Sequence, residues 1–187
     1  IARDPQLYEH KPFHSLTTLV TDQILLAQAL VNYQAVYIHS SGIIMGGQGL
    51  LFVGHSGAGK STMLKMLRGQ GEILCDDRNI IRRWPDGFRV HGTWSHGELP
   101  DVSPAGAPLR GIFFLEQAHT NQCIPLTDNA EILTGLLSCV VKGLVTKNWW
   151  EKVLVLAGQI AREVPIYRLQ FDQSGAVLHV LRDRCET

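Results

Sequence analysis

Residues 54–61 have the types and the spacing of a phosphate-binding loop. They match the pattern G-x-x-x-x-G-K-[ST] as Gly54, His55, Ser56, Gly57, Ala58, Gly59, Lys60 and Ser61. Glycines let the backbone fold around phosphate oxygens, Lys60 brings a positive charge to the outer phosphates, and Ser61 offers a hydroxyl to Mg²⁺. The other interpretation is a glycine-rich turn that binds no ligand.

The sequence on either side of this loop favours phosphate binding. The apolar run 50–53 predicts a strand that enters the loop, and 61–68 predicts a helix that leaves it. Free backbone N–H groups and the positive end of the helix dipole would then point at one spot. The sequence therefore predicts a nucleoside triphosphate site formed by Gly54, Ser56, Gly57, Ala58, Gly59, Lys60, Ser61 and Thr62.

An acidic pair, Asp76 and Asp77, follows the short apolar run 73–75. This run predicts a strand, and ligands of α/β sheets sit at the carboxyl ends of strands. One aspartate can hold Mg²⁺, and the other can accept a proton from an attacking hydroxyl. A turn or cap at the strand end is the alternative, because Asp favours such positions. Next to the glycine-rich loop we prefer the functional interpretation, and which aspartate is the base stays open.

His39 ends a predicted strand, 36–39, that precedes the loop strand. If the strands over 36–53 are neighbours, the end of the first lies at the same sheet edge as the loop. From the spacing alone, a His39 near the phosphate site and a His39 that is simply a surface or core residue are equally favoured.

The elements that must position these residues indicate a mixed α/β fold around one twisted sheet with flanking helices. Residues 1–15, with two prolines, read as an irregular lead-in, and 16–187 as one domain. The chain opens at Ile1, so we expect a longer natural product. The predicted elements are a helix over 21–33, strands over 36–39, 42–45 and 49–53 with the last two as a hairpin, a helix over 61–68, a strand over 73–75, a hairpin over 77–89, a strand over 109–115, helices over 128–142 and 149–162, and a closing hairpin of 165–171 with 176–181.

Composition narrows the class of protein. The chain has 187 residues, 45% of them hydrophobic, which is enough for one core. Lys plus Arg and Asp plus Glu both total 17, so no charge excess points to nucleic acid or to an acidic membrane. Its four cysteines form no C-x-x-C pair, and no apolar run reaches the roughly 20 residues of a membrane helix. We expect a soluble, cytoplasmic protein.

The run 39–61, followed by 73–77, resembles the HPr serine kinase/phosphorylase family, which has a phosphoenolpyruvate carboxykinase-like P-loop fold. The resemblance is close over 36–77 and weaker over 108–115 and 164–169. It implies a single P-loop domain like that of the small serine-kinase-like members. The glycine-rich signature that bifunctional members carry after the loop is not found, so the resemblance does not extend to phosphorolysis or to HPr as the acceptor.

By this resemblance the cofactors are ATP and Mg²⁺, and the γ-phosphate passes to a serine hydroxyl of a protein, peptide or small-molecule acceptor. The resemblance places His39 in the active site and makes Asp76 and Asp77 the catalytic base and a metal contact. It leaves a homo-oligomer open. Two other functions stay under consideration: a nucleotide-binding regulatory module without catalysis, and a carboxykinase-like enzyme acting on a small metabolite, which we rank last.

Other residues have weaker signals. The long segment 91–108 is expected to form a lid or to hold the acceptor, with Glu98 the first residue to test, or to be a surface loop. Arg110 would stabilise transferring phosphate or pair with a surface carboxylate. A solvated hairpin face is expected for Arg78, Arg82 and Arg83. Packing is expected for Trp149 and Trp150.

Overall fold

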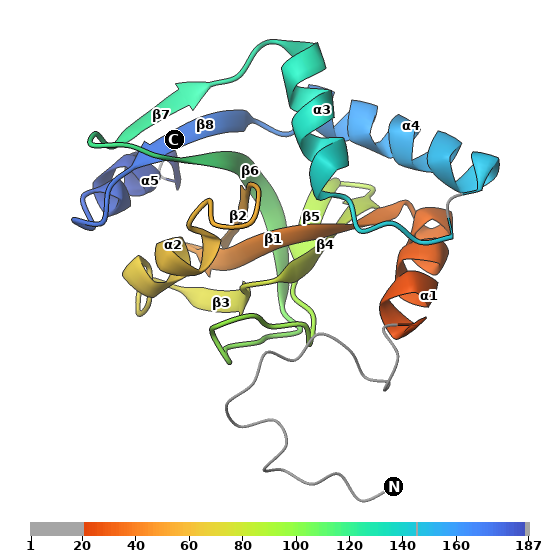
Figure 1. Ribbon diagram of the computed structural model, residues 1–187, viewed down its shortest axis with the longest axis horizontal. Helices are drawn as coiled ribbons and strands as arrows, with labels where there is room; N and C mark the ends of the chain where they lie inside the picture. Colours follow the sequence, from red (N-terminus) through yellow and green to blue (C-terminus); the bar gives the residue numbers. More distant parts are fainter. Residues whose placement is uncertain (1–20, 145, 186–187) are drawn as a thin grey trace, which may run out of the picture.

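The computed structural model describes residues 21–144 and 146–185, so the lead-in expected over 1–15 lies outside the described residues. Figure 1 shows the elements. In chain order they are α1 (Thr21–Leu30), η2 (Val31–Tyr33), β1 (Ala35–Met45), β2 (Gln48–Val53), α2 (Lys60–Met66), β3 (Glu72–Cys75), β4 (Arg78–Trp84), β5 (Gly87–His91), β6 (Gly106–Gln117), β7 (Gln122–Pro125), α3 (Asn129–Cys139), α4 (Lys147–Glu163), β8 (Ile166–Phe171) and α5 (Val177–Cys185). No helix among these is both long and apolar enough to cross a membrane.

The strands form one mixed sheet in the order β2-β1-β4-β5-β6-β8-β7, with β3 paired to β1. β6 runs parallel to β2 and to β8, and the other pairs are antiparallel. The additional pairing of β2 with β6 joins β2, β1, β4, β5 and β6 into a ring. The prediction of a mixed sheet with flanking helices is therefore confirmed.

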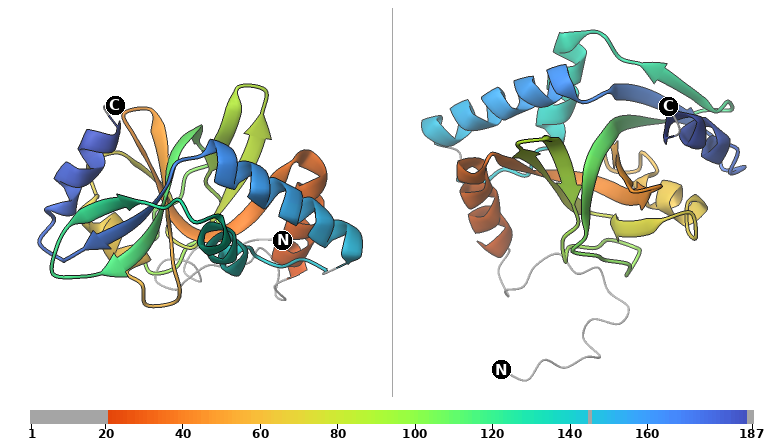
Figure 2. Two further views of the ribbon diagram at one scale, coloured as in Figure 1. Left: turned by 90° about the horizontal axis from the view of Figure 1, so that it is seen from above. Right: turned by 180° about the vertical axis from the view of Figure 1, so that it is seen from behind.

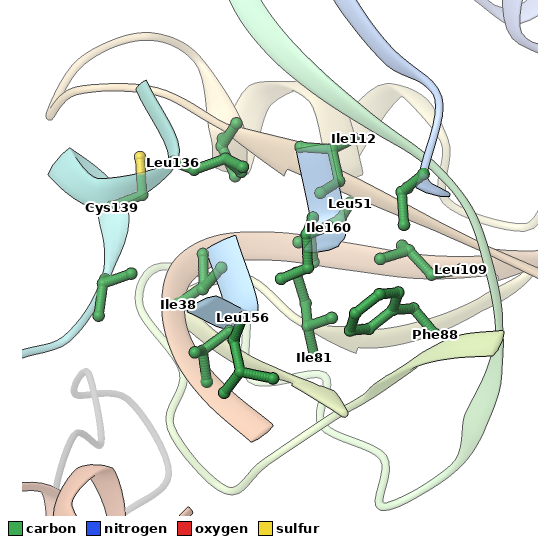
Figure 3. Close-up of a cluster of buried hydrophobic side chains, with 14 of the residues drawn as sticks. Ile38, Leu51, Ile81, Phe88, Leu109, Ile112, Leu136, Cys139, Leu156 and Ile160 are labelled. Carbon is green, nitrogen blue, oxygen red and sulfur yellow. The ribbon is translucent and has the colours of Figure 1, made fainter. Parts of the chain in front are cut away.

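Helices cover the sheet in two groups. Figures 1 and 2 show α3 and α4 together on one side, with α2 and α5 away from them. Neighbouring residues of β2 enter different cores: Leu51 packs in the cluster that contains α3 and α4, and Phe52 in the one that contains α2 and α5. Successive side chains of a strand point to opposite faces, which explains this division. Figure 3 shows Leu51 and Ile112 beside Ile160 of α4 in the first cluster.

The two strands predicted over 36–39 and 42–45 are a single strand, β1. The polar residues between them do not break it because their groups are satisfied inside the protein. Ser40 N–H donates to the carbonyl of Asp77 at 2.9 Å, and Ser41 Oγ donates to the carbonyl of Lys60 at 3.3 Å. The predicted hairpin over 42–53 is confirmed as the antiparallel pair of β1 with β2.

The strand predicted over 176–181 is wrong, because 177–181 lie in α5 and residue 176 lies in the turn before it. Val177 and Leu181 are fully buried and four residues apart, the spacing of one helix face. The strand that pairs antiparallel with β8 is instead β7, which was not predicted from the sequence. The predicted segment 91–108 is also shorter than expected, because β6 already begins at Gly106.

Candidate functional site

The glycine-rich loop 54–59 joins the end of β2 to the start of α2, which confirms the predicted strand, loop and helix. Gly57 and Gly59 have φ of +82° and +96°, values that favour glycine. A Cβ at Gly59 would lie 2.7 Å from the Phe171 ring, and one at Gly54 would lie 2.7 Å from the Cβ of Ala58. The loop therefore needs glycine both for its backbone angles and for close packing.

Lys60 lies inside the curve of this loop. Its side chain is largely buried, and Nζ donates to the carbonyl oxygens of Gly54 at 2.9 Å and His55 at 3.1 Å. Burial lowers the pKa of Lys60, while the nearby Cys139 and Asp77 act in the opposite direction. The ammonium group is thus held where the loop turns around it.

The Ser61 hydroxyl lies next to Asp76. Ser61 Oγ donates to Asp76 Oδ2 at 3.2 Å, although the two residues belong to α2 and to the turn after β3. Asp76 is buried and also accepts from the backbone N–H groups of Gly97 at 2.5 Å and Leu99 at 2.9 Å. The fold therefore brings the first aspartate to the glycine-rich loop.

Asp77 lies beside His39. His39 Nδ1 is 3.1 Å from Asp77 Oδ1, while Arg78 Nη1 is 3.0 Å from Oδ2 and Ser95 Oγ donates to the same oxygen at 2.6 Å. Asp77 is buried, whereas the His39 side chain is 40% exposed. Ser40, the next residue, pairs with Val53 at the start of the loop, so His39 approaches the site from within β1 rather than from a strand end.

The segment 92–105 is packed against the acidic pair. Ser95 is fully buried. Ion pairs attach the segment to α2 and to the turn after it: Lys65 of α2 pairs with Glu98 at 2.7 Å, and Arg68 of the turn pairs with Asp101 at 2.5 Å. Ser103 N–H donates to the carbonyl of Leu74 at 2.8 Å. The segment supports Asp76 and Asp77, and in this conformation it does not form an open lid.

A cavity of about 400 Å³ adjoins the glycine-rich loop. Gln117 closes part of it, with Nε2 donating to the carbonyl of Gly57 at 2.9 Å. The lining residues are Gly59, Thr62, Gln117, Ala118, His119, Phe171, Asp172 and Gln173. Thr62, predicted as a nucleotide contact, thus faces space that a ligand of the loop could share.

No three His, Cys, Asp or Glu side chains within 21–144 and 146–185 form a metal site by themselves. Ser61 and Asp76 offer oxygens at one point, which fits Mg²⁺, an ion held by one or two carboxylates together with phosphate oxygens. The donor set therefore suits a magnesium ion that arrives with a nucleotide.

Comparison with known proteins assigns the family. The model described as "SynChlorMet cassette protein ScmC" matches residues 14–182. The chain belongs to the ScmC family. No curated protein matches the chain. A solved structure of the HPr(Ser) kinase/phosphatase from Coxiella burnetii is similar with a TM-score of 0.48 and 10% identity, over 80% of this chain and 92% of that chain. That similarity is too distant to support an argument about function.

Two residues that contact the aspartates were not predicted from the sequence, and other residues have contacts that differ from those predicted. Ser95 and Gly97 contact the aspartates from a segment in which no motif marks them. Arg78, expected on a solvated face, instead pairs with Asp77. Arg110 lies four residues before Phe114, the partner of Val53, so along β6 it is about 13 Å from the loop end of the sheet.

Glu98, expected as a lid residue, is exposed and paired with Lys65. Trp149 is buried and stacks on Trp150 at 5.5 Å between ring centroids, as packing residues do. The packing expected of these two tryptophans is confirmed.

Proposed function

We propose that this protein is an ATP- and Mg²⁺-dependent kinase that transfers the γ-phosphate to a serine hydroxyl of a protein, peptide or small-molecule acceptor. The observation that supports this most is the 3.2 Å contact of Ser61 Oγ with Asp76 Oδ2 at the end of a glycine-rich loop that encloses Lys60. A turn without a ligand would need neither a buried lysine nor a carboxylate there. The motif resemblance of 39–61 and 73–77 supports the same function.

The residues around the loop would divide the work of binding. Backbone N–H groups of 54–59 would contact the phosphates, and Lys60 would exchange the carbonyls of Gly54 and His55 for phosphate oxygens. Ser61 and Asp76 would hold Mg²⁺, which shields the phosphate charge when bound. The cavity next to Gly59 and Thr62 has room for the nucleoside.

Asp77 and His39 would accept the proton of the acceptor hydroxyl. Arg78 and Ser95 fix one oxygen of Asp77, and His39 occupies the other with its ring partly exposed. As the serine oxygen forms its bond to the γ-phosphorus, its proton passes to this pair, and the bond from phosphorus to the bridging oxygen of ADP breaks. The buried carboxylate thus keeps the exposed imidazole in position.

The test is transfer of labelled γ-phosphate to candidate acceptors, including small proteins, serine-containing peptides and free serine, followed by mass spectrometry. We expect one acceptor to gain one phosphate with the native chain and none with Lys60→Ala. Lys65→Ala is the matched control, since Lys65 lies on the same helix and contacts only Glu98 among the carboxylates of the described residues. Equal labelling by Lys60→Ala would refute the proposal.

A second function, a nucleotide-binding regulatory module without transfer, is favoured by one observation. Both aspartates already have several protein donors, from Ser61 and the segment 92–105 for Asp76 and from Ser95, Arg78 and His39 for Asp77. Such a module would bind ATP through Lys60 yet label no acceptor. In that case nucleotide would change the hydrogen-exchange rates of the backbone amides of 92–105, and no phosphate transfer would accompany the change.

A further inference from the structure

One face of β4 leads away from the acidic pair. Side chains alternate along a strand, so Arg78, Ile80, Arg82 and Trp84 share a face, while Ile81 enters the core. Arg78 is the residue that pairs with Asp77. At about 3.3 Å per residue, Arg82 lies about 13 Å along the strand from Arg78. This face therefore joins the candidate site to the far end of the β4–β5 hairpin.

At that far end four side chains form a cluster that we call the cationic clamp: Arg82, Trp84, Arg89 and His91. The Cζ atoms of Arg82 and Arg89 lie 4.8 Å and 5.7 Å from the centre of a Trp84 ring, and the His91 ring lies 6.3 Å from it. Trp84 is 38% exposed. The left view of Figure 2 shows the tip of this hairpin clear of the other elements.

The positive charge of the clamp is only partly balanced. Arg89 pairs with Asp86 at 2.8 Å, whereas Arg82 has no carboxylate partner among the residues that the structure describes. The Nε atoms of both arginines and Nε2 of His91 are buried, and none of them has a hydrogen-bond partner among the described residues. Contact with an aromatic ring leaves a guanidinium charged, so the clamp attracts anions.

An apolar cavity of about 430 Å³ adjoins the clamp. Ile80 lines it and is the cross-strand partner of His91, so the cavity lies between the clamp and Arg78 on the same strand face. Its other lining residues are Leu26, Gly92, Thr93, Trp94, Val102, Ser103 and Pro104. Trp94 Nε1 is buried without a partner in the described chain and can donate a hydrogen bond to an occupant.

We propose that the cationic clamp and this cavity dock an acidic segment of a polypeptide acceptor. An apolar side chain of the acceptor fills the cavity, and carboxylates about four residues from the target serine contact Arg82 and Arg89, because 13 Å corresponds to about four extended residues. A small metabolite would not span that distance. The position of the target serine in this inference rests on the proposed kinase function. Docking of the acidic segment does not, because it needs no nucleotide.

Fluorescence anisotropy tests the docking without ATP. The probe is a labelled peptide with one serine, a leucine two residues from it, and Glu-Glu pairs about four residues away on both sides, compared with a Gln-Gln version. We expect the full chain to bind the glutamate peptide about tenfold more tightly, with the preference shrinking as salt rises. The double change Arg82→Gln and Arg89→Gln should remove the preference.

The matched control is the paired change Lys152→Gln and Arg182→Gln, which removes two cations that hydrogen-bond to Asn32 and Gln70, outside the hairpin, and should leave the preference intact. Circular dichroism verifies that each variant is folded, and Arg82→Gln alone gives a milder second test. Equal affinity for both peptides, or equal loss with the control, would overturn the proposal. Sedimentation would also overturn it if the chain formed a dimer that Arg82→Gln dissociates, because the clamp would then be an interface between two copies. A third contrary result would be a single-stranded oligonucleotide that displaces the glutamate peptide while the Gln-Gln peptide does not compete with the oligonucleotide. Docking without phosphate transfer would leave the inference standing and contradict only the proposed kinase function.

Discussion

One face of β4 runs from Arg78, which pairs with Asp77 of the candidate site, to the cationic clamp, and charged groups in these two regions are paired to different degrees. At the site, Asp76 and Asp77 are buried and each accepts from several protein donors. At the clamp, Arg82 packs against Trp84 without a carboxylate partner among the described residues. The first arrangement fixes side chains in place, as the proposed catalysis requires, and the second leaves charge for the proposed acceptor. Changes to carboxylates in the two regions should therefore have opposite outcomes.

The largest effect is expected for Asp77→Asn. The amide keeps the shape of the side chain but cannot take a proton, so transfer should fall about 10³-fold, within the range that general-base catalysis contributes. Nucleotide affinity, which in the proposed mechanism depends on the loop and Lys60, should stay within about threefold of the native value. The measurements are the rate of labelled phosphate transfer and nucleotide titration by calorimetry. A variant that transfers phosphate at the native rate would remove Asp77 from the mechanism.

The next effect concerns the loop itself. Gly59→Ala places a Cβ 2.7 Å from the Phe171 ring at a φ of +96°, whereas Gly57→Ala meets no atom within 4 Å at a φ of +82°. Both changes strain the backbone, at about 1–3 kcal/mol, but only the first also displaces a buried ring. Denaturant unfolding should show a larger loss for Gly59→Ala, and Phe171→Leu should recover part of it. Equal losses in the two variants would show that the contact with Phe171 is unimportant.

Local sequence patterns predicted most of the backbone structure around the glycine-rich loop. They predicted few of the contacts that Asp76 and Asp77 make with the segment 92–105. The turn at 85–87 and the glycines at 57 and 59 need particular residue types for their own backbone geometry, so each type can be recognised from the sequence. Ser95 acts on Asp77 across 18 positions, and nothing near Ser95 distinguishes it from Ser103. Such contacts depend on how 92–105 packs, which local spacing does not specify.

The same limit explains the error at the end of the chain. Residues 176–181 form an apolar run with His179 as its one polar residue, which suits a strand, and they also place Val177 and Leu181 at helical spacing. The place beside β8 is taken by β7, a short strand with mostly exposed residues that carries almost no pattern. The choice between strand and helix was therefore made by packing partners elsewhere in the sheet.

A smaller effect is expected for a carboxylate at the clamp. Asp86 is 60% exposed and pairs with Arg89, so Asp86→Asn should free this guanidinium and raise the affinity for the glutamate peptide about two- to threefold. Glu151→Gln, on α4, is the control that removes one negative charge elsewhere. Anisotropy titrations at low salt measure both. Weaker binding after Asp86→Asn would mean that Asp86 organises the clamp rather than competing with the acceptor.

The smallest effect is a shift in the titration of His91. Burial lowers the pKa of His91, and repulsion by Arg82 and Arg89 lowers it further. Arg82→Gln should therefore raise this pKa part of the way toward its ordinary value, because the burial remains. The measurement is the imidazole signal followed by NMR as a function of pH, and the glutamate peptide should raise the pKa of His91 in the native chain as well.

The same shift predicts how acid affects stability. A histidine whose pKa is lower in the folded state than in the unfolded state binds its proton more readily after unfolding. The neutral His91 thus supports the fold above about pH 6.5, and this contribution is lost as the pH falls below that value. Arg82→Gln should reduce the loss, since protonated His91 would meet one cation fewer, and unfolding midpoints at several pH values would show it. An unchanged His91 titration in Arg82→Gln would mean that burial alone sets its pKa and that the arginines act on a partner independently of this ring.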